Sequence, residues 1–325
     1  MPIEHRIVQA ADADSRLDRW FRRHFPQVTQ GALQKLLRTG QVRVDGKRVE
    51  TSTRLARGQE VRIPPLPKGP APETAPKERP VTEEDARALE RMILYRDDSV
   101  IALNKPHGLP VQGGPNIRKH LDGMLDALRF GHPERPRLVH RLDRDTSGVL
   151  LLARDSYAAN RLAAAFRGRD AEKIYWAIVV GQPQYQGGRI DMPLAKIGGP
   201  QGERTAPSEG KEGVHAITEF NTIDVARRHA TWLELKPLTG RTHQLRVHCA
   251  AALGCPILGD GKYGGQAAHL EGLPHALHLH ARSITVPHPE GGTLEVSAPL
   301  PPHMVESFGF LGFEKPRTPQ PKRRS

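Results

Sequence analysis

The sequence predicts an α+β protein: a large mixed sheet, largely antiparallel, preceded by a small separate unit. From about residue 83, several segments with strand-like alternation follow one another without helices between them, which argues against a doubly wound parallel fold. Residues 15–63 have a different pattern of helix, helix and hairpin. The chain has 325 residues, of which 37% are hydrophobic, enough for two cores.

The small unit, residues 15–63, is predicted from capping, periodicity and turn signals. Ser15-Arg16-Leu17-Asp18 has the form of a capping box and predicts the start of a helix. A second helix should end at Gly40, Asp45-Gly46 predicts a type I′ turn, and 60–63 should be a strand. The apolar positions with helical spacing are Leu17, Trp20, Phe21, His24 and Phe25 in the first helix, and Ala32, Leu33, Leu36 and Leu37 in the second.

Positive charge is concentrated in two places along the chain. Residues 15–63 carry 12 Lys/Arg against 4 Asp/Glu, and residues 314–325, a basic tail, carry 5 against 1. Clustered cations favour binding to a polyanion, with nucleic acid preferred over the alternative of a merely solvated basic surface. The candidate RNA-binding side chains on the outer helix faces are Arg19, Arg22, Arg23, Lys35 and Arg38.

The rest of the chain is predicted as a linker and one large domain. Residues 64–80 contain seven prolines and should form an extended tether, and the large domain should span 83–310. Residues 200–213 look like a flexible insertion. The expected helices are 121–128 and 160–166, and the expected strands are 92–95, 100–104, 149–153, 174–180, 215–225, 231–236, 276–286 and 293–298.

Several classes of protein are disfavoured. The longest apolar run, Val149–Ala153, is too short to span a membrane, and the N-terminus has no apolar segment. Cys249 and Cys255 are too few for a disulfide framework or a structural zinc site. The neighbouring histidines His275, His278 and His280 lack the Cys or carboxylate partners of a zinc set. We therefore expect a cytoplasmic protein, a monomer, with no metal and no membrane association.

The run His140–Gly148 places two carboxylates directly before the apolar strand 149–153. A carboxylate there is costly unless it is paired, hydrogen-bonded or functional. Together with Asn104–Pro110, Glu172–Ala177 and Leu238–His248, in this order, the run resembles the Rlu-type pseudouridine synthases of large-subunit ribosomal RNA, and most of all their RluC group. This resemblance spans about residues 92–289.

Residues 15–63, with RLDRW, LLRTGQVRVDG and GQEVRI, resemble the S4 RNA-binding domain. A helix-turn-helix DNA-binding unit is the alternative, but the hairpin forms half of this unit and the turn lacks the usual glycine placement.

The two resemblances imply a fold and an activity. The large domain should have the pseudouridine synthase fold and isomerise specific uridines in large-subunit (23S-type) ribosomal RNA after extruding the base, without a cofactor. Its partner should be ribosomal RNA or a pre-ribosomal particle. Whether the carboxylate forms an adduct or starts an elimination stays open. The alternative is a noncatalytic RNA-binding or ribosome-assembly factor on the same fold.

The resemblance assigns Asp143 as the catalytic carboxylate and Arg241 as the cation that keeps it ionised. Asp145 is the competing carboxylate, although we expect it to be a turn residue that accepts hydrogen bonds from the amides of Ser147 and Gly148. Arg241 could instead be a surface contact for phosphate.

Tyr175 should stack on the uracil, with its hydroxyl near the C5 proton; the alternative is an ordinary core aromatic. Arg141 should enter the space that the flipped base leaves, and its alternative is a salt bridge to Asp145.

Overall fold

The computed structural model describes residues 3–9, 12–66, 81–114, 117, 119–198, 204–208, 210, 212–227, 229–314 and 317–324. The chain divides into two units, Met1–Glu78 and Arg79–Ser325, each with its own core. Most of the expected linker lies outside the described residues. Among the helices of the described ranges, none is both long and apolar enough to cross a membrane.

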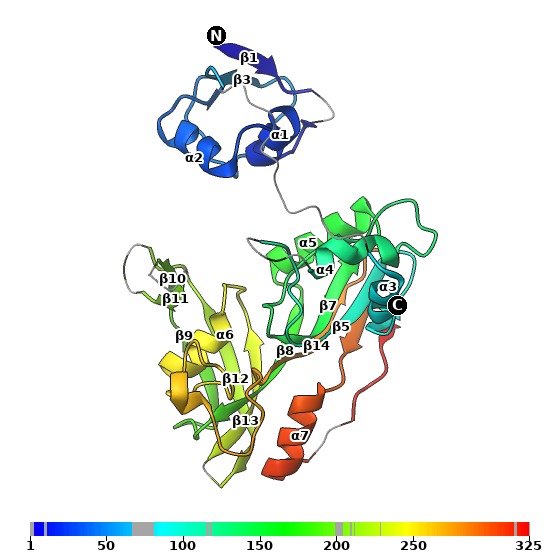
Figure 1. Cartoon of the computed structure of the whole chain (residues 1–325), viewed down its shortest axis with the longest axis vertical. Coiled ribbons are helices and arrows are strands. Elements are labelled where there is room, and N and C mark those ends of the chain that lie inside the picture. Colours follow the sequence, from blue (N-terminus) through cyan, green and yellow to red (C-terminus); the bar gives the residue numbers. More distant parts are fainter. Residues whose placement is uncertain are drawn as a thin grey trace. The chain divides into compact units, whose positions relative to one another are not determined.

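The smaller unit combines two helices with a three-stranded antiparallel sheet of order β1-β3-β2 (Figure 1). Both predicted helices form, and their apolar faces share one core with the sheet. The indole ring of Trp20 lies edge-on to Phe21, with 5.4 Å between ring centroids. The elements are β1 (Glu4–Ile7), α1 (Leu17–His24), α2 (Gln30–Arg38), β2 (Arg43–Val44) and β3 (Glu60–Ile63).

The turn prediction in this unit is confirmed and the capping prediction is wrong. Asp45 and Gly46 both have positive φ, 48° and 73°, as a type I′ turn requires. The N-cap of α1 is Arg16, whose side chain makes no cap hydrogen bond. It binds the carboxylate of Asp18 at 2.6 Å instead, and that carboxylate also accepts from the amide of Arg19 at 2.8 Å.

The larger unit is built on an 11-stranded sheet, whose main path runs β4-β5-β7-β14-β8-β13-β12-β9. Strands β7 and β14 pair in parallel, and the other described pairs of this sheet are antiparallel, so the predicted fold class is confirmed. The strands are β4 (Ile93–Arg96), β5 (Val100–Lys105), β6 (Arg137–Leu138), β7 (Ser147–Ala153), β8 (Glu172–Val180), β9 (Gly187–Asp191), β12 (Ile217–Ala226), β13 (Ala230–Pro237), β14 (Leu279–Pro287), β15 (Thr293–Ser297) and β16 (Lys322–Arg324).

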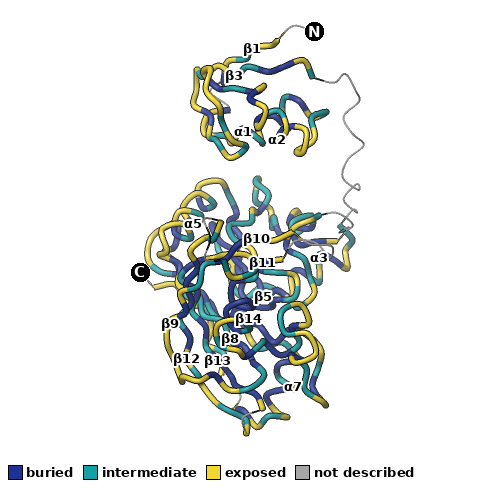
Figure 2. Tube along the Cα trace, turned by 90° about the vertical axis from the view of Figure 1, so that its left-hand side faces the viewer, coloured by how far each residue is buried: buried dark blue, intermediate teal, exposed yellow. Residues whose placement is uncertain are grey.

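Helices cover both faces of this sheet, which explains the unbroken apolar run of β7. Val149 and Leu151 pack under α5, whereas Leu150 and Leu152 pack on the opposite side with α3, α4 and the 3₁₀ turn that follows. Figure 2 shows the central strands as buried segments. Farther along the sheet, β8 and β13 lie between α6 and α7. The helices are α3 (Glu83–Glu90), α4 (Leu121–Met124) with the 3₁₀ turn Leu125–Leu128, α5 (Ser156–Gly168), α6 (Gln244–Val247) with the π-helical turn His248–Ala252, the 3₁₀ turn Gly265–Ala268, and α7 (Pro302–Leu311).

The parallel contact between β7 and β14 requires a glycine. Gly148 has φ of 110°, and a Cβ atom placed on it would lie 2.2 Å from the carbonyl oxygen of Ala281. The backbones can approach this closely only because no side chain intervenes. This contact fixes the start of β7, and with it the end of the preceding loop, beside β14.

Two segments that were not predicted as strands contribute strands. Within 200–213, β11 (Arg204–Pro207) pairs with β10 (Leu194–Ile197) as a separate two-stranded sheet. Within the basic tail, β16 pairs with β15, and the guanidinium of Arg282 donates to the Arg317 carbonyl at 2.8 Å. A buried arginine therefore holds the tail against the sheet.

Candidate active site

The loop between β6 and β7 carries both carboxylates, and the partly buried His140 fixes the N-terminal part of the loop. The Nε2 atom of His140 accepts a hydrogen bond from the Leu151 amide at 2.8 Å, and the imidazole stacks on Phe166 with 4.5 Å between centroids. Burial, helped by the charge of Lys173, lowers the pKa of His140 to about 3. The ring is therefore neutral and acts as an acceptor for the backbone of β7.

A buried lysine holds the middle of this loop. Lys105, at the end of β5, is fully buried, and its Nζ atom donates to the carbonyls of Pro106, Leu109 and Arg144 at 2.9 Å each. Burial lowers the pKa of Lys105 to about 7, against the opposing charges of Asp145 and Asp143. In its ammonium form, Lys105 therefore has one N–H donor for each of these three carbonyls, one of which lies between the two aspartates.

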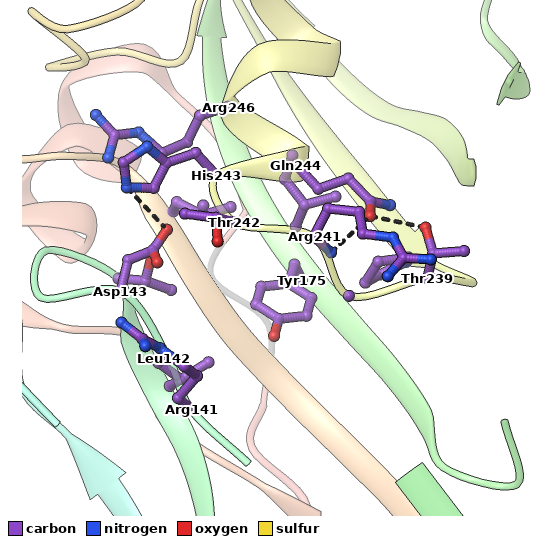
Figure 3. Close-up of a pocket in the computed structure, with 15 residues that line it drawn as sticks. Arg141, Leu142, Asp143, Tyr175, Thr239, Arg241, Thr242, His243, Gln244 and Arg246 are labelled. Carbon is purple, nitrogen blue, oxygen red and sulfur yellow. Dashed lines mark hydrogen bonds and ion pairs between the residues drawn. The ribbon is translucent and has the colours of Figure 1, made fainter. Parts of the chain in front are cut away.

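A cavity of about 140 Å³ brings together the predicted catalytic residues and Arg141 (Figure 3). Its walls come from the β6–β7 loop, from β8, and from the segment between β13 and α6. Helix α6 and the turn after it follow this segment, with Leu245 and Cys249 buried against the sheet. The lining residues discussed below are Arg141, Asp143, Tyr175, Arg241, His243 and Arg246.

The carboxylate of Asp143 faces His243, with 3.9 Å between Oδ2 and Nε2. Both side chains are sheltered yet reachable from solvent, at 23% and 19% exposure. His243 has a left-handed backbone, with φ of 54°, and its Nδ1 atom lies 2.7 Å from the hydroxyl of Tyr263. Burial lowers the pKa of His243 although the charge of Asp143 opposes this, so the ring is mostly neutral near pH 7.

Arg241 lines the cavity but does not make the predicted ion pair with Asp143. Its Nε atom donates to the His215 carbonyl at 3.1 Å, and its amide donates to Oε1 of Gln244. Figure 3 shows the side chain extending away from Asp143, toward Thr239. The left-handed turn at His243 separates Arg241 from the residues on the Asp143 side. The expected pairing is corrected accordingly.

Arg246 is a buried cation of this cavity that the sequence patterns did not single out. It makes two hydrogen bonds to the carboxylate of Asp260, at 2.8 and 2.6 Å. Burial opposes its charge, but the bonds and charge of Asp260, together with the charge of Asp143, raise the pKa of Arg246. One signal was present: an arginine between Leu245 and Val247, at a core position, needs a partner.

Tyr175 lies on β8 between two core clusters and also lines the cavity. Burial, followed by the charge of Asp143, raises the pKa of its hydroxyl above the usual range. The hydroxyl therefore stays protonated at neutral pH. The ring packs against both core clusters and also borders the cavity, so stacking on the uracil stays a prediction.

Asp145 is engaged outside the cavity. Its carboxylate accepts from Nε of Arg144 at 3.0 Å and lies 3.9 Å from Nε2 of His107. Among the described interactions, it makes none of the expected hydrogen bonds to the amides of Ser147 and Gly148, and no salt bridge to Arg141. Arg141 remains exposed at the cavity rim.

The five basic side chains predicted to bind RNA are all exposed on α1 and α2. Arg23 differs from the others because it binds the buried carboxylate of Asp12 at 2.6 Å, which His24 also contacts at 2.8 Å. The ion pair between Arg23 and Asp12 therefore also stabilises the fold of the small unit. Within the ranges described, no group of three His, Cys, Asp or Glu side chains is arranged to hold a metal ion.

Comparison with known proteins finds a matching family for each of the two units. Residues 99–251 match the RNA pseudouridylate synthase family, and residues 15–61 match the S4 domain. The chain is 36% identical to RNA pseudouridine synthase 4, mitochondrial, of Arabidopsis thaliana, over 90% of this chain and 78% of that protein. It is 37% identical to ribosomal large subunit pseudouridine synthase C of Escherichia coli, over 90% and 92%.

A solved structure agrees with these matches. Human RNA pseudouridylate synthase domain containing 4 resembles this chain with a TM-score of 0.61 and 32% identity, over 71% of this chain and 97% of that one. Family match, relatives and fold point the same way: the chain belongs to the RNA pseudouridylate synthase family, carries an N-terminal S4 domain, and is an RNA pseudouridine synthase, an isomerase.

Proposed function

We propose that this protein converts specific uridines of large-subunit ribosomal RNA to pseudouridine, with Asp143 as the catalytic carboxylate. The observation that carries the assignment is the position of Asp143 in a cavity also lined by Tyr175 and Arg246. The ribosomal target is supported by the names of relatives such as the Escherichia coli protein. Cytoplasmic location and a monomeric state stay predictions.

The reaction breaks the N1–C1′ bond, turns the uracil and joins its C5 to C1′. It needs an ionised carboxylate beside the sugar and a pocket that retains the detached base. Arg246, fixed by Asp260, places a positive charge in the wall of the cavity that also holds Asp143. The Tyr175 ring offers a face for the uracil, and its protonated hydroxyl can take part in proton exchange at C5.

The target uridine must leave its stack before it can enter the cavity. Arg141 is suited to fill the gap, because it is exposed at the rim and a guanidinium can stack and donate hydrogen bonds together. The S4 unit adds affinity for structured RNA through Arg19, Arg22, Lys35 and Arg38, with Arg23 contributing the charge that Asp12 leaves unneutralised.

Asp143→Asn tests the assignment, with Asp145→Asn as its matched control. We expect Asp143→Asn to abolish tritium release from C5-labelled uridine RNA while RNA binding is retained. Asp145→Asn should keep most turnover, because its carboxylate is bound to Arg144 outside the cavity. If Asp145→Asn abolishes tritium release and Asp143→Asn does not, the catalytic role belongs to Asp145. Mapping pseudouridines in ribosomal RNA from cells with and without the protein identifies the target.

A further inference from the structure

A second hollow, of about 790 Å³, opens beside the cavity between the C-terminal end of α5 and the start of β8. It shares Arg141, Tyr175 and Arg241 with the cavity, so the two hollows are neighbours that these side chains border from both sides. We call it the Lys173 groove. Its basic lining residues are Arg141, Arg167, Arg169, Lys173, Lys236 and Arg241.

The charges in the Lys173 groove are unbalanced. Six cations face two acids, Asp170 and Glu172, and Glu172 is already bound to Lys236 at 2.7 Å. In the described part of the chain, no hydrogen bond or ion pair engages the side chains of four of the cations. These four are Arg141, Arg167, Arg169 and Lys173.

Lys173 is the best placed of the four. It precedes Tyr175 by two residues on β8, so both side chains lie on the same face of the strand, and both line the groove. Its side chain is partly buried, and this burial lowers its pKa. A partly desolvated ammonium without an anion is costly, and an incoming anion would remove that cost.

The hollow on the other side of the cavity, about 510 Å³, is less suited to a polyanion. It contains the carboxylates of Asp143 and Asp145. Its arginines are already occupied, since Arg144 binds Asp145 and Arg246 binds Asp260. Charge therefore favours the Lys173 groove as the path of an RNA backbone.

We propose that the Lys173 groove holds the phosphodiester backbone of the RNA strand beside the target uridine, with Lys173 contacting the phosphate nearest the flipped nucleotide. This inference rests on the proposed function and adds to it the direction from which the strand reaches Asp143. Arg167 and Arg169, at the end of α5, would follow the backbone farther from the cavity.

The test compares Lys173→Met with wild type on transcribed large-subunit ribosomal RNA. Binding is measured by filter retention at several salt concentrations, and pseudouridine formation gives kcat and KM. Loss of one phosphate contact should make the slope of log K against log salt less steep by about 0.7 for a single strand. Affinity should fall roughly tenfold, as for one hydrogen bond to a charged group. Lys173→Arg should keep most of both.

Arg161→Met is the matched control, because it removes an exposed cation from α5 that does not line the groove. Lys173→Gln replaces Lys173→Met if the latter does not fold. The proposal is overturned if the neutral variants keep the wild-type slope and affinity, or change no more than Arg161→Met. Wild-type protein that forms no pseudouridine in this RNA would contradict the proposed function instead, whatever the slopes.

Discussion

The carboxylate of Asp143 lies 3.9 Å from the imidazole of His243, while Arg241, two residues before that histidine, turns toward the His215 carbonyl. Arg246 is a cation of this cavity on which the charge of Asp143 acts, because Asp143 contributes to its raised pKa. The two arginines in one short segment therefore have different environments, and their substitutions should have different consequences.

Arg241→Lys should be mild and Arg246→Lys severe. A lysine at 241 loses one hydrogen bond to a carbonyl, and we expect turnover to fall less than fivefold. A lysine at 246 cannot make the paired hydrogen bonds to Asp260 inside the protein, which should cost about 3 kcal/mol of stability. Tritium release and urea denaturation measure both effects. A severe loss of turnover in Arg241→Lys, without one in Arg246→Lys, would support the ion pair between Arg241 and Asp143 that the sequence predicted.

Tyr175→Phe should bind RNA as wild type does, because the ring that faces the cavity is unchanged. Tyr175→Leu should bind more weakly, since loss of base stacking costs about 1–3 kcal/mol. Filter binding with a matched RNA fragment compares the two. Turnover of the Phe variant isolates the hydroxyl, and a loss of about 100-fold or more would assign it a proton-transfer role. Equal binding by the Phe and Leu variants would contradict stacking.

Gly148→Ala should be strongly destabilising, because its Cβ would lie 2.2 Å from a backbone oxygen of β14. We expect a loss of more than about 4 kcal/mol, measured by urea denaturation. Gly108→Ala is the matched control: Gly108 also has positive φ, 82°, but a Cβ atom there would have no other heavy atom within 4 Å beyond its chain neighbours. That substitution should cost only about 1 kcal/mol. If the two variants lose similar free energies of unfolding, the positive φ alone accounts for both losses, without a contribution from the contact with β14.

Stability should fall as the pH drops below 6.5, because buried histidines resist protonation. Burial lowers the pKa of His140 and His280 to about 3 and of His278 to about 4. Between those values and 6.5, the unfolded chain binds protons that the folded chain does not, so acid favours unfolding. Three such groups give a slope of about 4 kcal/mol per pH unit. Urea denaturation from pH 7 to 5 measures it, and His140→Gln should remove about a third of the slope. An unchanged slope in that variant would contradict a neutral His140.

The sequence predicted most of the large sheet, because its strands have clear apolar patterns. Strand β7, which is buried on both faces, is an unbroken apolar run. The sequence also predicted that Asp143, Tyr175 and Arg141 belong to one site, through motifs rather than geometry. It did not predict the partner of Asp143. That depends on the left-handed backbone of His243, a conformation which a β-carbon disfavours and no residue pattern announces. Strands β10 and β11 were missed because their segment has little apolar alternation.

Lys105 offers a way to follow the movement of the loop between β6 and β7 over time. Its ammonium is enclosed by three peptide oxygens, so reagents that acylate accessible amines should reach it only when the loop opens. The labelling rate of Lys105 would then report how often the loop opens, and a bound substrate that holds the loop closed would lower that rate.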